Sequence, residues 1–265
     1  MTTITRNQKI YFGAVGLLAL WVGAWGYFIP QQVDKAIPWL VPPLHARFLG
    51  AMYLSGTAFM VAGILSRYYA EVRVMVPMIV IWTGMLFIVS LFYLGEFDYS
   101  RPQVWIWFAA YIVYPLIGLW YMWRDRNQAE TVEGSALPSW IRVCFLIQGI
   151  AVTTLSFALL VAPDVMAGAW PWKITRLLAQ IYSAPFLSYG LGSLMLSRKQ
   201  TWSETRVSAI GIFTFTLGVL LASLLHRELF SFSTAASWLW FGGFTLSTLF
   251  LGIMLLRNRF SRGSP

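Results

Sequence analysis

The sequence predicts an all-α integral membrane protein with eight transmembrane helices, built as two tandem parallel four-helix repeats. Three observations lead to this prediction. Of the 265 residues, 58% are hydrophobic and only 11% are charged, against about 25% charged residues in an ordinary soluble domain. The few charged residues leave eight long uncharged runs between them. The second half of the chain also repeats sequence patterns of the first half.

Each uncharged run is long enough to form a membrane-spanning helix. The runs hold 19 to 28 residues, and a helix that rises about 1.5 Å per residue needs about 20 apolar residues to cross about 30 Å of hydrocarbon. The runs are continuously apolar, whereas the strands of a membrane barrel alternate, so helices are expected. In chain order the runs cover residues 10–33, 48–66, 74–95, 102–123, 143–163, 177–197, 207–226 and 229–256.

The first run could also be read as a secretory signal, because Arg6 and Lys9 precede it. It is long for the apolar region of a signal peptide, however, and residues 27–31 contain no small-residue cleavage site. We therefore predict that it is the first span.

An internal repeat relates the two halves of the chain. Residues 105–108 read WIWF and residues 238–241 read WLWF, at an offset of 133. Around the second and sixth runs the offset is 129, which pairs Arg47 with Arg176. Because the matches extend over the whole four-run unit, they favour a tandem duplication over chance similarity.

The repeat divides the chain into three segments. Residues 1–126 form the first four-helix repeat, residues 127–139 a polar cytoplasmic linker, and residues 140–265 the second repeat. Four spans are an even number, so both copies enter the membrane in the same direction. The other connections are short and leave no soluble domain, so function is expected within the bundle or at its two faces.

The basic residues predict the orientation. With the N-terminus in the cytoplasm, 13 of the 19 Lys and Arg residues lie on the cytoplasmic side, so both termini are expected there. We expect a plasma membrane, and the short loops favour the inner membrane of a bacterium. The net charge of +9 is then mainly a topology signal, and the predicted partners are the lipid bilayer and a membrane-protein partner or second copy, without nucleic acid.

The ionisable residues avoid the centre of the runs, which disfavours coupling to protons or sodium ions across the membrane. The more suggestive group lies at the expected outer face, where Arg47 and Arg176 open the second and sixth runs. Two repeat-related guanidiniums could face one outward cavity and hold a carboxylate, a phosphate or a lipid headgroup. The predicted ligand-binding residues are Arg47, Arg176, Tyr53, Tyr182, His45, His226 and Glu228.

A plainer interpretation gives the two arginines a structural role. They would then anchor the helix ends at the membrane interface. Their partners would be the acidic residues at the same face, namely Glu96, Asp98, Asp164 or Glu228.

Cofactor and enzyme interpretations are weaker. His45 and His226 raise the question of a haem held by two imidazoles, and Glu96, Asp98 or Glu228 could join a histidine at a metal. His45 aligns with Ile174 and His226 with Tyr93, so each histidine is unique to its copy, and no further motif supports either site. No catalytic or metal-binding residue is predicted, because no nucleophile or metal-binding motif accompanies His226 and Glu228.

Three classes of function follow. The first is binding or passage of a small solute or lipid-like molecule between the two repeats, since duplicated bundles commonly place sites there. The second is a non-catalytic subunit of a larger membrane complex, favoured by the lack of buried charge. A membrane enzyme or haem carrier is the third and least supported class.

Overall fold

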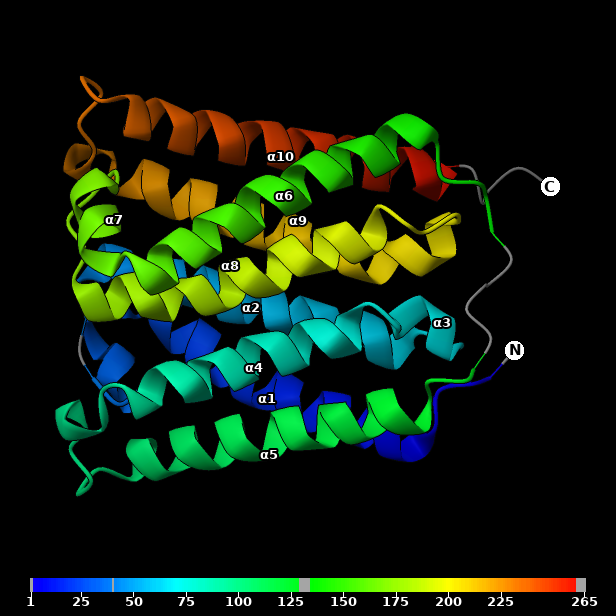
Figure 1. Cartoon of the computed structure of the whole chain (residues 1–265), viewed down its shortest axis with the longest axis horizontal. Coiled ribbons are helices and arrows are strands. Elements are labelled where there is room, and N and C mark those ends of the chain that lie inside the picture. Colours follow the sequence, from blue (N-terminus) through cyan, green and yellow to red (C-terminus); the bar gives the residue numbers. More distant parts are fainter. Residues whose placement is uncertain (1, 40, 129–133, 261–265) are drawn as a thin grey trace. The chain divides into compact units, whose positions relative to one another are not determined.

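The computed structural model describes residues 2–39, 41–128 and 134–260, with side chains up to Arg257 in the last helix. Within these residues all regular structure is helical and no extended strand forms, which confirms the predicted all-α fold (Figure 1). The predicted linker includes residues 129–133 and the predicted second repeat includes residues 261–265, and both stretches lie outside the described residues.

The long helices follow the predicted runs closely. Short 3-10 helices η1 (Pro30–Lys35), η2 (Leu94–Glu96) and η3 (Arg227–Leu229) follow three of them at their carboxyl ends. The α-helices are α1 (Arg6–Phe28), α2 (Pro43–Leu65), α3 (Tyr69–Val72), α4 (Met75–Leu91), α5 (Pro102–Arg124), α6 (Ser139–Val161), α7 (Pro163–Ala169), α8 (Arg176–Leu196), α9 (Trp202–Leu225) and α10 (Ala235–Phe260).

Seven helices in the described part of the chain are long and apolar enough to cross a membrane. They correspond to seven of the eight predicted runs. The remaining run, residues 177–197, forms α8, which has the required length but is not among the seven. The chain therefore has the composition and the helices of a multi-pass membrane protein, whereas the predicted count of eight spans exceeds the seven found.

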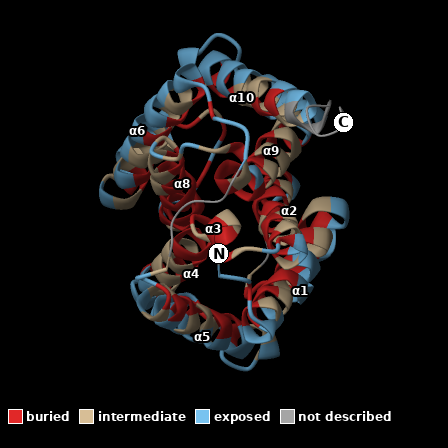
Figure 2. Cartoon of the chain, turned by 90° about the vertical axis from the view of Figure 1, so that its right-hand side faces the viewer, coloured by how far each residue is buried: buried red, intermediate tan, exposed pale blue. Residues whose placement is uncertain are grey.

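The composition of α8 explains this difference. The ribbon of α8 is coloured as buried over much of its length (Figure 2). The helix carries buried polar residues, including Gln180, Ser183 and Ser188. Their hydrogen-bonding groups reach neighbouring backbone: Gln180 Nε2 donates to the carbonyl of Leu160 at 2.9 Å, and Ser188 Oγ donates to that of Met78 at 2.8 Å. A helix enclosed by other helices need not be as apolar as one that faces lipid.

The helices form two compact units. Unit 1 consists of Met1–Thr3 and Arg67–Thr205, and unit 2 of Ile4–Ser66 and Arg206–Pro265. Unit 1 thus contains the third to sixth predicted runs, and unit 2 contains the first, second, seventh and eighth. Each unit takes two runs from each predicted repeat, and the division of the chain into repeats stays a prediction from the sequence.

In unit 2, glycines let α1 and α2 approach closely. A Cβ atom added to Gly26 would lie 2.8 Å from the carbonyl oxygen of Ala46, and one added to Gly50 would lie 2.8 Å from the carbonyl carbon of Gly26. Real side chains do not reach such distances, so both positions require glycine.

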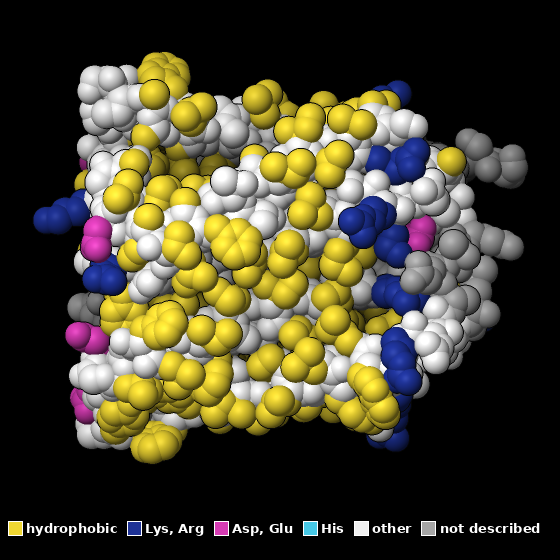
Figure 3. All heavy atoms as spheres, viewed as in Figure 1, with side chains coloured by type: hydrophobic (Ala, Val, Ile, Leu, Met, Phe, Trp, Pro, Cys, Tyr) yellow, Lys and Arg dark blue, Asp and Glu magenta, His cyan; other side chains and the backbone are white. Residues whose placement is uncertain are grey.

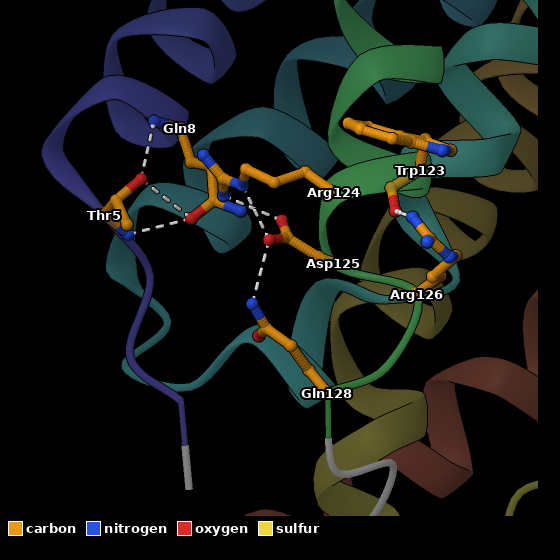
Figure 4. Close-up of polar contacts among 7 residues, drawn as sticks. All are labelled: Thr5, Gln8, Trp123, Arg124, Asp125, Arg126 and Gln128. Carbon is orange, nitrogen blue, oxygen red and sulfur yellow. Dashed lines mark hydrogen bonds and ion pairs between the residues drawn. The ribbon is translucent and has the colours of Figure 1, made fainter.

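The N-terminus of α1 is closed by a capping box, in which Thr5 and Gln8 each accept a hydrogen bond from the other's backbone N–H (Figure 4).

Aromatic rings pack between α2, α9 and α10 in unit 2. Phe48 of α2 packs against Phe215 of α9 and Trp240 of α10, with ring centroids 6.2 and 5.7 Å apart. In unit 1, α8 lies against both α4 and α6, and Tyr182 is fully buried beside Trp170.

On the face shown in Figure 3, hydrophobic side chains cover the middle of the helices, whereas Lys and Arg side chains lie near helix ends, as a bilayer requires.

Candidate functional site

Arg47 lies in the first turns of α2, and prolines determine where this helix begins. Pro42 is extended and Pro43 is the first helical residue, a position where its missing N–H costs no hydrogen bond. Arg47 Nη1 donates to Nε2 of His226, which follows the last residue of α9, at 2.5 Å. Both residues belong to unit 2, so the fold brings together two predicted ligand-binding residues 179 positions apart.

The chemistry of this contact defines the state of the imidazole. A guanidinium has donors only, so Nε2 of His226 must accept and its proton must be on Nδ1. Nδ1 lies 3.5 Å from Oε1 of Glu228. Arg47, His226 and Glu228 therefore form a chain in which the His226 side chain is 15% exposed and the Glu228 side chain 65% exposed.

Arg176, which the sequence alignment pairs with Arg47, lies in unit 1. Thr175 caps α8 by accepting from the N–H of Leu178, so Arg176 is the first helical residue. Its Nη1 atom lies 3.7 Å from Oδ2 of Asp164, and both side chains are largely exposed. An exposed pair at this distance contributes little to stability. This is one of the pairings expected if the arginines are interfacial anchors.

Arg176 also interacts with Tyr93, the residue that aligns with His226. Tyr93 lies just after α4 in unit 1, and the Arg176 guanidinium is near enough to influence the pKa of its phenol. Burial raises the pKa of the Tyr93 phenol above its ordinary value, while the charge and the hydrogen bond of Arg176 act in the opposite direction. In both units, then, an arginine that opens a helix meets the residue that follows another helix.

The remaining predicted site residues lie deeper in the units. Tyr53 is 9% exposed and Tyr182 is fully buried, so their side chains are part of the packed core. His45 is 6% exposed and lies two residues before Arg47 on α2, which places the two side chains about 200 degrees apart around the helix. These three residues do not share the exposed surface of Arg176 or Glu228.

The two arginines belong to different units, and the common outward cavity expected for them stays a prediction. Sequence reasoning aligned Tyr93 with His226 but did not pair it with Arg176. If the two halves are repeats, as the sequence predicts, a contact of Arg47 with His226 would imply one between their counterparts Arg176 and Tyr93. Among the described residues no group of three or more His, Cys, Asp and Glu side chains could hold a metal ion.

Comparison of the chain with protein-family models, with curated proteins and with solved structures finds no match.

Proposed function

We propose that this chain is an eight-span plasma-membrane protein that binds an anionic solute or lipid headgroup at two related positions, one at Arg47 and one at Arg176. The observation that carries the proposal is the hydrogen bond of Arg47 to His226 in unit 2, together with the influence of Arg176 on the pKa of Tyr93, the counterpart of His226, in unit 1. In each case the arginine comes from one predicted repeat and its partner from the other. Each position is thus a site between the two repeats that lies within one unit.

Matching side-chain contacts support a tandem duplication. The indole N–H of Trp107 donates to Ser90 Oγ at 2.9 Å, and Trp240 donates to Ser223 at 2.9 Å, 133 positions later. The same offset relates further hydrogen bonds, ring contacts and backbone bridges. They are Trp105 with Tyr99 and Trp238 with Phe232, Phe97 with Phe108 and Phe230 with Phe241, and Thr3 with Tyr68 and Ala136 with Thr201.

The length of α8 supports its role as the eighth span. Its 21 residues cover about 30 Å at about 1.5 Å per residue, the thickness of the hydrocarbon layer. With eight spans both termini lie on the same side, and the excess of Lys and Arg there favours the cytoplasm. Arg47 and Arg176 then lie at the outer face, in what we propose to be a bacterial inner membrane.

The ligand chemistry follows from the arginines. A guanidinium is planar and can donate two parallel hydrogen bonds to a phosphate or carboxylate. Asp164 is exposed and holds Arg176 across 3.7 Å, so an incoming anion can displace it at small cost. Lipid headgroups present such anions at the depth of these helix ends.

A second candidate function is a subunit of a larger membrane complex. Helix α6 in unit 1 and helix α10 in unit 2 are the least buried of the apolar helices, with 22% and 11% of their most hydrophobic stretch buried. Lipid covers such faces in any membrane protein, and a partner protein would cover them equally well. A stoichiometric protein that co-purifies in mild detergent and protects α10 from lipid-phase labelling would favour this function.

The proposed function is tested by counting bound phosphatidylglycerol with native mass spectrometry. We expect the double variant Arg47→Ala, Arg176→Ala to bind at least about tenfold more weakly than wild type, since charged hydrogen bonds contribute about 1.5–3 kcal/mol each. The matched control is Lys173→Ala, Arg227→Ala, which removes two exposed cations from the same expected face. Equal binding by the two double variants would contradict the proposal.

A further inference from the structure

The two proposed positions differ in one respect that bears on their regulation. We propose that protonation of His226 releases Arg47, so that the position in unit 2 binds a tetrahedral oxyanion more tightly in acid than at neutral pH. This inference rests on the proposed function and adds a proton-dependent switch to one of the two sites. The position in unit 1, which has Tyr93 in place of His226, lacks this switch.

The geometry supplies the switch. Arg47 Nη1 can donate to His226 only while Nε2 carries a lone pair, because a guanidinium accepts no hydrogen bond. Protonation of Nε2 turns the acceptor into a donor and places two positive groups against each other. The contact that holds the guanidinium is then lost, and both cations can bind the same anion. Histidine is the side chain whose charge changes between pH 5 and 8.

The other groups around His226 are compatible with this change. Glu228 lies 3.5 Å from Nδ1, which carries a proton in both states of the ring. From α1, Tyr27 uses its hydroxyl to donate to the carbonyl of Gly218 at 2.9 Å. Arg227, the residue after His226, is exposed. His45, two residues before Arg47, is 6% exposed. Glu228 is therefore the one group among these that stabilises protonated His226 directly, at the exposed end of the chain of contacts.

Unit 1 provides an internal comparison. Tyr93 changes charge only in alkaline solution, and burial moves its titration further from neutrality. The position that corresponds to Glu228 is Gly95, and the carboxylates that act on Tyr93 are those of Asp164 and Glu96. Asp164 pairs with Arg176 across 3.7 Å, and both side chains are largely exposed. Anion binding at Arg176 should accordingly be the same at pH 5 and pH 8.

The experiment uses the full chain with Arg176→Ala, so that binding reports the position at Arg47 alone. Phosphatidylglycerol binding is measured at pH 5 and pH 8, and its phosphodiester carries one negative charge at both. We expect binding about tenfold tighter at pH 5, a typical size for coupling between two binding events. With His226→Gln added, whose side-chain oxygen accepts from Arg47 but takes up no proton, binding should be equal at both pH values.

Two further arms make the result specific. Asp98→Asn in the same background removes a different titratable group from the expected outer face and should leave the ratio between the two pH values at about tenfold. Sulfate, which is a dianion at both pH values, identifies the source of the anion. If sulfate competes at pH 5 the site takes free oxyanions, and if it does not the site takes lipid headgroups; either result supports the inference when the ratio is present.

Failure of the inference and failure of the proposed function give different results. Binding that persists at both pH values after Arg47→Ala is added to Arg176→Ala contradicts the proposed function. Binding that Arg47→Ala abolishes, but that is equal at pH 5 and pH 8 in the Arg176→Ala protein, overturns the switch alone. Elution of every variant at the wild-type volume in size-exclusion chromatography shows that the comparison concerns folded protein.

Discussion

The hydroxyl of Tyr93 donates to Oε1 of Gln180 at 2.5 Å and so joins the segment after α4 to helix α8. The amide of Gln180 uses its other end as well, because Nε2 donates to the carbonyl of Leu160 in α6 at 2.9 Å. One side chain thereby connects three helices of unit 1. Since Tyr93 is also within reach of Arg176, the state of its phenol affects both the packing and the proposed anion position.

Ionisation of Tyr93 should lower the stability of unit 1 in alkaline solution. Its pKa is raised by burial, so the folded state holds this proton more tightly than the unfolded state. The resulting stabilisation is fully present below the ordinary tyrosine pKa of about 10 and is lost as the pH rises through the higher folded-state value. We expect the thermal stability of wild type to fall more steeply between pH 9 and pH 11 than that of Tyr93→Phe. A fall of equal steepness in both proteins would contradict the assignment.

Gly50 should not tolerate even a methyl group. A Cβ atom there would collide with the backbone nitrogen of Tyr27 and approach the carbonyl carbon of Gly26 to 2.8 Å. Gly50→Ala should lower the free energy of unfolding in mixed micelles by about 1–3 kcal/mol, as overpacking does. Gly13→Ala is the control, because nothing lies within 4 Å of the new atom and alanine favours a helix by up to about 1 kcal/mol. The prediction is wrong if the two variants are equally stable.

Ser90 and Ser223 should contribute equally to their respective units. Each accepts from a buried indole N–H at 2.9 Å, Trp107 in one case and Trp240 in the other. Alanine at either position leaves that donor without an acceptor, at a cost of about 1–3 kcal/mol in the free energy of unfolding. Ser233→Ala, at an exposed position, should change it by less than about 0.5 kcal/mol. Loss of stability in only one of the two serine variants would argue against equivalent packing.

Asp125 should be more sensitive to substitution than Asp164, the exposed acidic residue of unit 1 that pairs with Arg176. Asp125 is 1% exposed and accepts two hydrogen bonds from Arg124, at 2.7 and 2.8 Å, and one from Gln128 Nε2 at 2.8 Å (Figure 4). Because Arg124 is 31% exposed, water replaces part of what is lost, and Asp125→Ala should cost about 2 kcal/mol. Asp164→Ala, which breaks an exposed pair, should cost less than about 1 kcal/mol. Chemical or SDS unfolding of the two variants compares these values directly.

Cysteine labelling decides whether α8 crosses the membrane. After Cys144→Ser removes the one native cysteine, Lys173→Cys and Arg198→Cys place single thiols on the two sides of α8. With eight spans and a cytoplasmic N-terminus, a membrane-impermeant maleimide should label position 173 in intact cells and label position 198 only after permeabilisation. Labelling of both positions in intact cells would show that α8 does not span.

Much of the fold could be predicted from the sequence because lipid imposes a local requirement. A run of about 20 uncharged residues must be helical in hydrocarbon, whatever its neighbours are, since its backbone groups have no other partners there. The run at 102–123 forms α5 (Pro102–Arg124) almost residue for residue. The repeated sequence patterns can be found in the same way, because this needs only the comparison of one segment with another, and the tandem duplication that they indicate stays a prediction.

Tertiary structure decided which helices share a unit and which side chains meet. The sequence pairs Arg47 with Arg176 as counterparts, but the fold gives each a different partner, His226 in unit 2 and Tyr93 in unit 1. Burial of Tyr53, Tyr182 and His45 was likewise not visible, because apolar runs carry almost no signal for which face of a helix is enclosed. Hydrophobicity determines that a segment enters the membrane, but since lipid and protein interior are similarly apolar, only packing determines what each helix contacts there.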